Sequence, residues 1–320
     1  MSETAIGIIG HEKILAFFEK VLANGNLAQA YLFVGPEMVG KTTVVEWLAK
    51  KILGPAGLSH PDALVLNRLT DEKTGKIKSE IVVDQVRGLR ERLAMTGLVG
   101  GRKVAFIEEA EALNIEAANA LLKTLEEPTL GTVLILRTSS LDKILPTIIS
   151  RCQIIRFSLM PNEKIVQALA HRGIIKKDAL AVAGLASGCP GYALRLLYDE
   201  EARTLEEVSA ARLIEVLQAP LASRLARAAE WLPKDETNKA QQLKELLNRW
   251  EWLLRDLLLA SCGIKELAAR FVAYPVLETE MKKKNSEHWL AALEKLQLIK
   301  NDLVFHVNPG LALEQLLLIL

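Results

Sequence analysis

The chain has 320 residues, half of them hydrophobic and only 5% aromatic, and its 40 basic and 39 acidic residues leave a formal charge of +1. This length predicts two or three domains, and the near-neutral charge excludes a global electrostatic field for nucleic acid or a membrane surface. No run approaches the roughly 20 apolar residues that a membrane-spanning helix needs, and the first residues do not have the pattern of a secretion signal. We therefore expect a cytoplasmic protein.

Short apolar runs of strand length alternate with helical patterns in the first half of the chain. The runs cover residues 31–34, 63–69, 103–109, 132–138 and 153–157. Between them, residues 42–53, 81–95 and 114–127 carry apolar residues at three- and four-residue spacing, as helices do. Strands that alternate with helices predict an α/β fold with a parallel sheet and helices on both faces.

The strand pattern disappears after Phe157. Three short helices are predicted at 161–172, 176–187 and 192–202, and the rest of the chain has a helical pattern interrupted by prolines. The sequence thus predicts three domains. They are an α/β domain at 1–157, a small helical domain at 158–205 and an all-helical domain at 206–320.

The sharpest motif is a phosphate loop between the first predicted strand and the helix that follows it. It has the Gly-x-x-x-x-Gly-Lys-Thr pattern, and with the next residue it comprises Gly35, Pro36, Glu37, Met38, Val39, Gly40, Lys41, Thr42 and Thr43. The glycines let backbone N–H groups point at phosphate oxygens, Lys41 reaches the β- and γ-phosphates, and Thr42 can hold Mg²⁺. The motif predicts binding of ATP with Mg²⁺; a glycine-rich turn without a ligand is the alternative.

Carboxylates at the end of the third apolar run can supply the acidic group that such a loop needs. Glu108 and Glu109 end this run, and Glu111 follows as an expected exposed neighbour. We predict that Glu108 holds Mg²⁺, where Asp is usual, and that Glu109 orients the attacking water. The alternative is that these acids form the solvated first turn of the next helix, where the helix dipole favours them.

Several stretches resemble the AAA+ core of bacterial clamp-loader subunits. The most specific are Leu-Glu-Glu-Pro at 125–128 and Ser-Arg-Cys at 150–152, and supporting stretches run from 8–15 to 306–320. Within this family the chain is most similar to the delta-prime group of DNA polymerase III. The resemblance implies that the three predicted domains are an AAA+ nucleotide-binding core, a helical lid and a collar that joins other subunits.

The resemblance assigns roles to two positions near the predicted sheet. Arg151, in Ser-Arg-Cys, would be an arginine finger that acts in trans on the nucleotide of a neighbouring subunit. Thr138 or Ser139, at the end of the fourth strand, would detect the γ-phosphate. The alternatives are an arginine that caps a helix C-terminus and an ordinary strand-end hydroxyl.

Two departures from the hydrolytic subunits of the family bear on activity. Those subunits carry a sensor arginine where this chain has Gly191, so hydrolysis here is expected to be weak or absent. They also contain a four-cysteine zinc module, whereas Cys152, Cys189 and Cys262 are widely spaced, so no zinc is expected.

The resemblance also implies partners. These are motor subunits of the tau/gamma type, a delta subunit, a sliding clamp and primed DNA reached through the assembled complex, with no membrane. The chain would bind ATP and complete a neighbour's active site while the clamp is loaded. Three alternatives are a motor subunit that hydrolyses ATP, an autonomous P-loop phosphotransferase and a scaffold with a vestigial phosphate loop.

Overall fold

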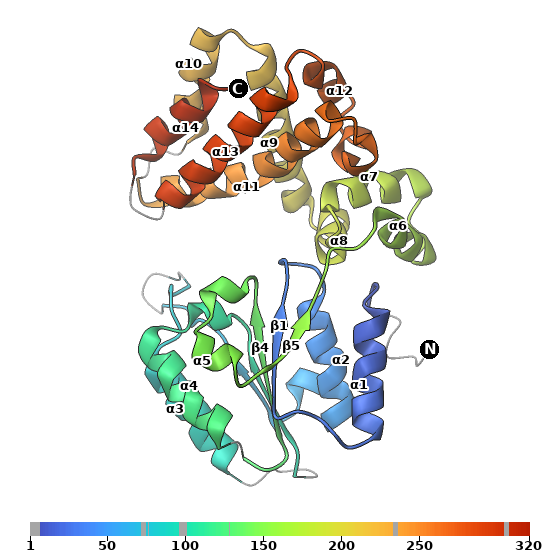
Figure 1. The fold of residues 1–320 in the computed structure, drawn as a ribbon, viewed down its shortest axis with the longest axis vertical. Coiled ribbons are helices and arrows are strands. Elements are labelled where there is room, and N and C mark those ends of the chain that lie inside the picture. The colour runs from blue at the N-terminus through green and yellow to red at the C-terminus, as the bar shows by residue number, and fades with distance from the viewer. Residues whose placement is uncertain are drawn as a thin grey trace. The chain divides into compact units, whose positions relative to one another are not determined.

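The computed structural model describes residues 7–71, 75, 77–95, 101–127, 129–232, 236–303 and 307–320 (Figure 1). Pro128, which ends the Leu-Glu-Glu-Pro motif, lies outside the described residues. The chain forms two compact units. The first unit is Met1–Met160 with Cys189–Gly191, and the second unit is Pro161–Gly188 with Tyr192–Leu320.

The first unit is built on a five-stranded sheet in which every neighbouring pair is parallel. Its strands are β1 (Ala30–Val34), β2 (Ala63–Leu66), β3 (Lys103–Ile107), β4 (Thr132–Thr138) and β5 (Gln153–Arg156), in the spatial order β2-β3-β4-β1-β5. The predicted α/β fold with a parallel sheet is therefore confirmed. The second and third strands end earlier than predicted, because the polar residues after Leu66 and Ile107 leave the sheet.

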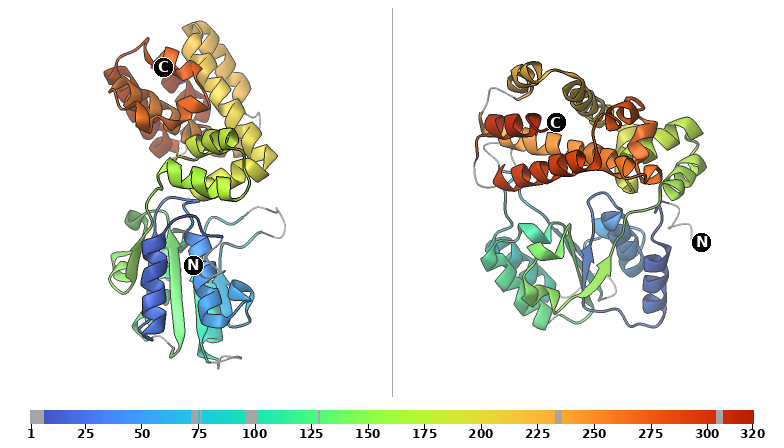
Figure 2. Two further views of the ribbon diagram at one scale, coloured as in Figure 1. Left: turned by 90° about the vertical axis from the view of Figure 1, so that its right-hand side faces the viewer. Right: turned by 45° about the horizontal axis from the view of Figure 1, so that its top comes forward.

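Helices cover both faces of this sheet (Figures 1 and 2). They are α1 (Glu12–Ala23), α2 (Lys41–Leu53), α3 (Val83–Ala94), α4 (Ile115–Glu126) and the short α5 (Pro146–Ile149). Alternate residues of β1 face opposite ways, as a strand requires. Tyr31 and Phe33 pack with Trp47 of α2, whereas Leu32 packs with Leu121 of α4.

The second unit contains only helices in the part of it that the structure describes. They are α6 (Asn162–His171), α7 (Lys176–Ala186), α8 (Pro190–Tyr198, of which the first two residues belong to the first unit), α9 (Glu200–Gln218), α10 (Leu221–Trp231), α11 (Glu236–Ser261), α12 (Val276–Met281), α13 (Ser286–Asp302) and α14 (Pro309–Leu317). Helix α9 continues without a break through residue 205, where the sequence suggested a boundary. The division into lid and collar stays a prediction.

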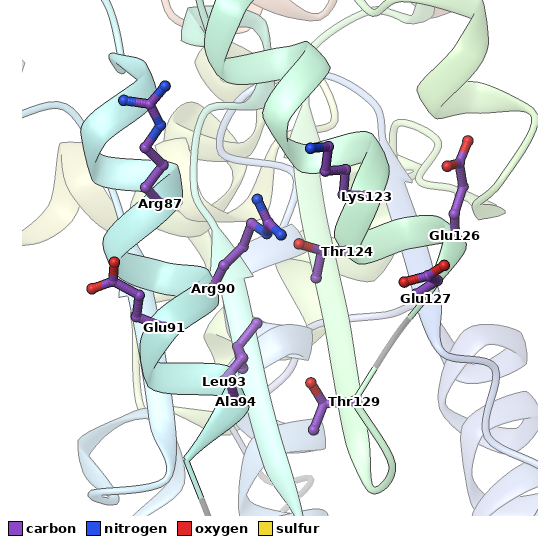
Figure 3. A pocket seen from close by; sticks show the side chains of 10 residues that line it. All are labelled: Arg87, Arg90, Glu91, Leu93, Ala94, Lys123, Thr124, Glu126, Glu127 and Thr129. Carbon is purple, nitrogen blue, oxygen red and sulfur yellow. The ribbon is translucent and has the colours of Figure 1, made fainter.

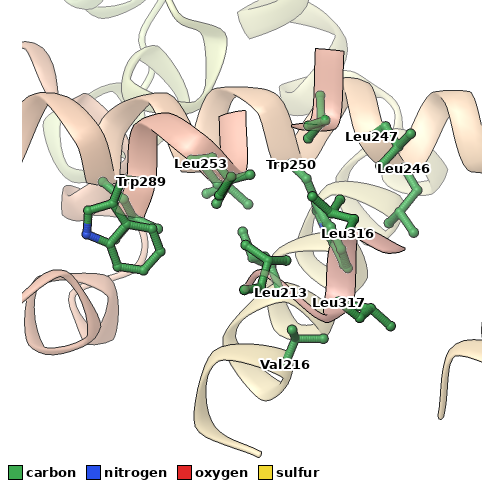
Figure 4. Close-up of a cluster of buried hydrophobic side chains, with 14 of the residues drawn as sticks. Leu213, Val216, Leu246, Leu247, Trp250, Leu253, Trp289, Leu316 and Leu317 are labelled. Carbon is green, nitrogen blue, oxygen red and sulfur yellow. The ribbon is translucent and has the colours of Figure 1, made fainter. Parts of the chain in front are cut away.

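Large apolar side chains form the centre of the second unit (Figure 4). Trp250 of α11 and Trp289 of α13 are fully buried there among leucines from α9, α11 and α14. Trp252, two residues from Trp250 and therefore on another side of α11, is half-buried against the guanidinium of Arg270. Among the described residues, no helix is both long and apolar enough to cross a membrane.

A buried arginine joins distant parts of the second unit. Arg270 is 2% exposed, and its guanidinium donates to the carbonyl oxygen of Leu185 at 2.7 Å and to the hydroxyl of Ser187. Its backbone N–H donates to the buried carboxylate of Asp256 at 3.0 Å. A buried charge is costly unless it is paired, so the guanidinium favours the conformation in which these partners are in place. In that conformation the end of α7 is joined to the short helices that follow α11.

Arg270→Ala should destabilise the second unit by about 2 to 4 kcal/mol, because the substitution removes the buried, charged donor of the hydrogen bonds to Leu185 and Ser187. Chemical denaturation followed by tryptophan fluorescence measures this, since four of the five tryptophans lie in the second unit. The exposed Arg203→Ala is the control and should change stability by less than about 0.5 kcal/mol. A loss below about 1 kcal/mol for Arg270→Ala would contradict the role given to this residue.

Candidate functional site: a phosphate-loop pocket

The phosphate loop leaves the end of β1 and enters α2 at the expected positions. Gly35 has φ +152°, and a Cβ at this position would lie 2.3 Å from the carbonyl oxygen of Phe157, so only glycine fits. Gly40, with φ +115°, precedes the first residue of α2. His11 contacts the loop, since its Nε2 lies 2.8 Å from the carbonyl oxygen of Val39.

Lys41 is turned back onto its own loop. Its side chain is buried, and its ammonium donates to the carbonyl oxygens of Gly35 and, at 2.6 Å, of Pro36. Burial, followed by the positive charge of Arg137, lowers the pKa of Lys41 to about 8. The ammonium thus lies within the loop that is expected to surround a phosphate, and it is still largely charged at neutral pH.

The end of β4 lies beside the loop because β1 and β4 pair in register, with Val34 opposite Thr138. Thr138 is buried, and its hydroxyl donates to the carbonyl oxygen of Ser140 at 2.9 Å. Ser139 donates to Glu111 from both its N–H and its hydroxyl, at 3.0 and 2.9 Å. Burial acts to raise the pKa of Glu111, but hydrogen bonds such as those from Ser139 outweigh it and lower that pKa.

The expectation that Glu111 is an exposed neighbour was wrong. The side chain is half-buried and lines the pocket, and its Oε2 atom is buried with no hydrogen-bond partner in the described structure. The reason is the turn after β3, which continues as a 3-10 helix over Ala110–Ala112 and directs Glu111 toward Ser139.

Both predicted catalytic acids are paired with arginines. Glu109 forms a two-pronged ion pair with Arg68, at 2.5 Å to Nε and 2.9 Å to Nη2. Glu108 lies 3.5 Å from Nη1 of Arg137, and Nε of Arg137 donates to the Glu108 carbonyl oxygen at 2.6 Å. The roles predicted for Glu108 and Glu109 stay predictions, and each carboxylate has an arginine beside it.

Sequence reasoning missed Arg137. Its Nη1 donates to the hydroxyl of Thr42 at 2.7 Å, so it contacts both residues that were expected to hold Mg²⁺. The sequence contained a signal, because Val133, Ile135 and Arg137 are alternate residues of one strand. Val133 and Ile135 pack on the face covered by α2, and Arg137 extends that row toward the start of α2.

Together these residues line a pocket of about 320 Å³. It brings together most of the predicted cofactor-binding and catalytic residues with Glu111, Arg137 and Ser139. The lining residues are Glu37, Met38, Gly40, Lys41, Thr42, Thr43, Glu108, Glu109, Glu111, Arg137, Thr138, Ser139 and Gly191.

Gly191 belongs to the first unit and contacts the phosphate loop directly. Its N–H donates to the carbonyl oxygen of Met38 at 2.8 Å, and a Cβ at Gly191 would lie 2.7 Å from that oxygen. A side chain at this position would therefore displace the loop, which is a physical reason for the glycine.

Among the predicted site residues, Arg151 alone lies at the end of the sheet where the strands begin, opposite the end that carries the phosphate loop. It precedes β5, whereas the phosphate loop follows β1, and these parallel strands separate the two by about 16 Å, the length of five extended residues. Its guanidinium is partly exposed and pairs with Glu126 of the Leu-Glu-Glu-Pro motif at 2.8 Å. Arg151 therefore does not belong to the pocket of its own chain.

A second cleft, of about 780 Å³, lies between α3 and α4 (Figure 3). Arg90 of α3 and Lys123 of α4 stand on its two walls, with Arg87 above them. The three cations are balanced by Glu91, Glu126 and Glu127, so the cleft has no excess of positive charge.

In the residues that the structure describes, no group of three His, Cys, Asp or Glu side chains is arranged to hold a metal ion.

Comparison with known proteins agrees with this geometry. A family model described as "DNA polymerase III, delta subunit" matches residues 10–161, which is the sheet-bearing part of the chain. The chain is 35% identical over 219 residues to the DNA polymerase III subunit delta′ of Pseudomonas aeruginosa, and 34% identical over 169 residues to that of Escherichia coli. The sheet-bearing part of the chain is thus similar to delta′ subunits of the DNA polymerase III clamp loader.

These matches cover only parts of the clamp-loader proteins. They span 61% and 52% of this chain, and 65% and 49% of the two relatives, respectively. The fold extends further. The crystal structure of a gamma-subunit-related protein from Thermotoga maritima has a TM-score of 0.50 at 18% identity and covers 94% of this chain and 97% of that chain.

The Lys41 environment gives a direct test of the pocket. The ammonium should titrate near pH 8, and Arg137→Ala should raise this pKa, because the substitution removes a nearby positive charge while burial still holds the pKa below the usual 10.4. NMR of lysines labelled at the ε-carbon measures the titration, and Lys41→Arg assigns the resonance by its loss. A Lys41 pKa that does not change in Arg137→Ala would contradict the contact between the two charges.

Proposed function

We propose that this chain is a delta-prime-type subunit of the DNA polymerase III clamp loader, which binds ATP at its own phosphate loop and supplies Arg151 to a neighbour's nucleotide. The observation that carries the proposal is the combination of an intact phosphate loop with an exposed Ser-Arg-Cys arginine at the opposite edge of the same sheet. The similarity to delta′ subunits of two bacteria supports it.

Nucleotide binding is supported by the pocket itself. The loop has a buried lysine whose hydrogen-bond partners are loop carbonyls, which a phosphate group would replace with stronger, charge-assisted contacts. The resemblance to clamp-loader subunits implies use of a nucleotide together with Mg²⁺.

Weak or absent hydrolysis is supported by the state of the catalytic acids. Glu109 is already held by Arg68 through two hydrogen bonds, so it is not free to orient water. Gly191 supplies no sensor charge. These two features disfavour the alternatives of a motor subunit and an autonomous phosphotransferase, because both need turnover at this pocket.

The partners follow from this role. A subunit whose arginine acts in trans needs a neighbour with a nucleotide, which for this family would be a tau/gamma-type motor subunit, with a delta subunit, the sliding clamp and primed DNA completing the assembly. We propose that the helices of residues 206–320 form the contacts between subunits. Several large apolar side chains there are exposed, among them Leu221, Leu290 and Leu311, and association would remove them from water.

Lys41→Ala should reduce the affinity for an ATP analogue below detection, because it removes the only buried cation of the phosphate loop described here. Isothermal titration calorimetry measures the binding. Lys51→Ala is the matched control, since Lys51 is an exposed lysine of the same helix, and its affinity should equal that of the unmodified chain. Equal affinity in both variants would exclude the proposed site.

Arg151→Ala should leave the chain's own nucleotide affinity and its assembly unchanged, because Arg151 lies at the far edge of the sheet from its own loop. The reconstituted complex should lose stimulated ATP turnover at one site, by up to about 10³-fold at that site. Steady-state turnover measures this after light scattering has shown equal assembly. The bulk loss will be smaller, because other subunit interfaces keep their own arginines.

Two further variants of the same complex separate a trans role from a structural one. Arg151→Lys should restore little turnover, because an ammonium cannot reproduce the planar fork of a guanidinium. Arg195→Ala removes another exposed arginine with a carboxylate partner and should leave turnover intact. Unchanged turnover in Arg151→Ala would disprove the finger.

A further inference from the structure

Arg137 lies where the metal ion of a phosphate-loop site would be expected. Its Nη1 donates to the Thr42 hydroxyl at 2.7 Å and lies 3.5 Å from the Glu108 carboxylate, and its Nε donates to the Glu108 carbonyl oxygen at 2.6 Å. One guanidinium thus bridges the end of β3 and the start of α2, which are the two elements expected to supply the protein ligands of Mg²⁺.

The residues of this pocket do not fit Mg²⁺ while Arg137 is in this position. Mg²⁺ requires oxygen ligands at about 2.0 to 2.1 Å in a near-octahedral arrangement. An ion at that distance from the Thr42 hydroxyl would be within about 5 Å of Nη1, since this nitrogen is itself 2.7 Å from the same oxygen. Arginine is always charged and has no acceptor, so it repels the ion and cannot ligate it.

Glu109 and Glu111 do not form a second metal position. Glu109 is held by both prongs of Arg68, and Glu111 accepts two hydrogen bonds from Ser139 through Oε1, which leaves its Oε2 as a single oxygen without a partner in the described structure. No three-residue metal cluster occurs in the portion of the chain that the structure describes. The positive charge available to a phosphate in this pocket therefore comes from Lys41 and Arg137.

We propose that Arg137 replaces the divalent cation, so that this subunit binds its nucleoside triphosphate in the metal-free form. The inference rests on the nucleotide-binding role proposed above. The fork of Arg137 is suited to it, because a guanidinium can keep one N–H on Thr42 or Glu108 while another donates to a phosphate oxygen. The same arrangement removes the ion that would assist hydrolysis.

The test is calorimetric titration of the full chain with a non-hydrolysable ATP analogue, once with excess Mg²⁺ and once with EDTA. The unmodified chain should bind at least as tightly in EDTA as in Mg²⁺. Arg137→Ala should bind more weakly in EDTA and gain tenfold or more in affinity from Mg²⁺, because Thr42 and Glu108 are then free to hold the ion. Arg87→Ala, an exposed arginine of α3, is the control and should behave like the unmodified chain.

Each other outcome overturns the inference in a recognisable way. A tenfold loss of affinity in EDTA for the unmodified chain would mean that Arg137 moves aside for the metal. If Arg137→Ala also bound the analogue equally tightly in EDTA and in Mg²⁺, Arg137 would have no part in the metal-free binding. No binding by the unmodified chain under either condition would remove the nucleotide site itself, and the proposed ATP binding with it. Folding of each variant is checked by circular dichroism and by its thermal unfolding.

Discussion

The parallel pairing of β1 with β4 determines which side chains meet at the pocket. The pairing aligns Val34 with Thr138, and a hydrogen bond of 3.3 Å from the Gly35 N–H to the Thr138 carbonyl oxygen extends it into the phosphate loop. Because parallel strands end at the same edge, the loop after β1 and the polar residues after β4 are neighbours although about 100 positions separate them. The contact between Arg137 of β4 and Thr42 at the start of α2 depends on this register.

Side-chain alternation along β4 then separates two kinds of residue within that edge. The even-numbered Thr138 turns toward Ser140, whereas the odd-numbered Arg137 lies on the α2 side, next to Thr42. A shift of one residue would exchange the two and bury a guanidinium among apolar side chains. The apolar residues that precede Arg137 on the same face therefore fix the position of a charge, and packing determines the electrostatics of the pocket.

The sequence predicts the strands and the phosphate loop because their signals are local. Apolar runs such as 132–138, short and rich in β-branched residues, are typical of buried strands, and the glycine spacing of 35–40 has few other uses. Pairings across long separations have no such signal. Arg68 and Glu109 are 41 residues apart, and Arg270 meets residues 83 to 85 positions away. Glu108 and Glu109 therefore line the pocket beside the loop, but their arginine partners were not foreseen.

The contacts of Arg270 also bear on the order in which the chain folds as it leaves the ribosome. All five strands of the sheet are complete once residue 156 has been made, so the first unit can form most of its core early. Helix α7 has no such independence, because the carbonyl of Leu185 and the hydroxyl of Ser187 receive their guanidinium only when residue 270 emerges. At a synthesis rate of about 5 to 20 residues per second, several seconds pass between the synthesis of α7 and that of Arg270. During synthesis the second unit is therefore the part whose buried contacts are completed last.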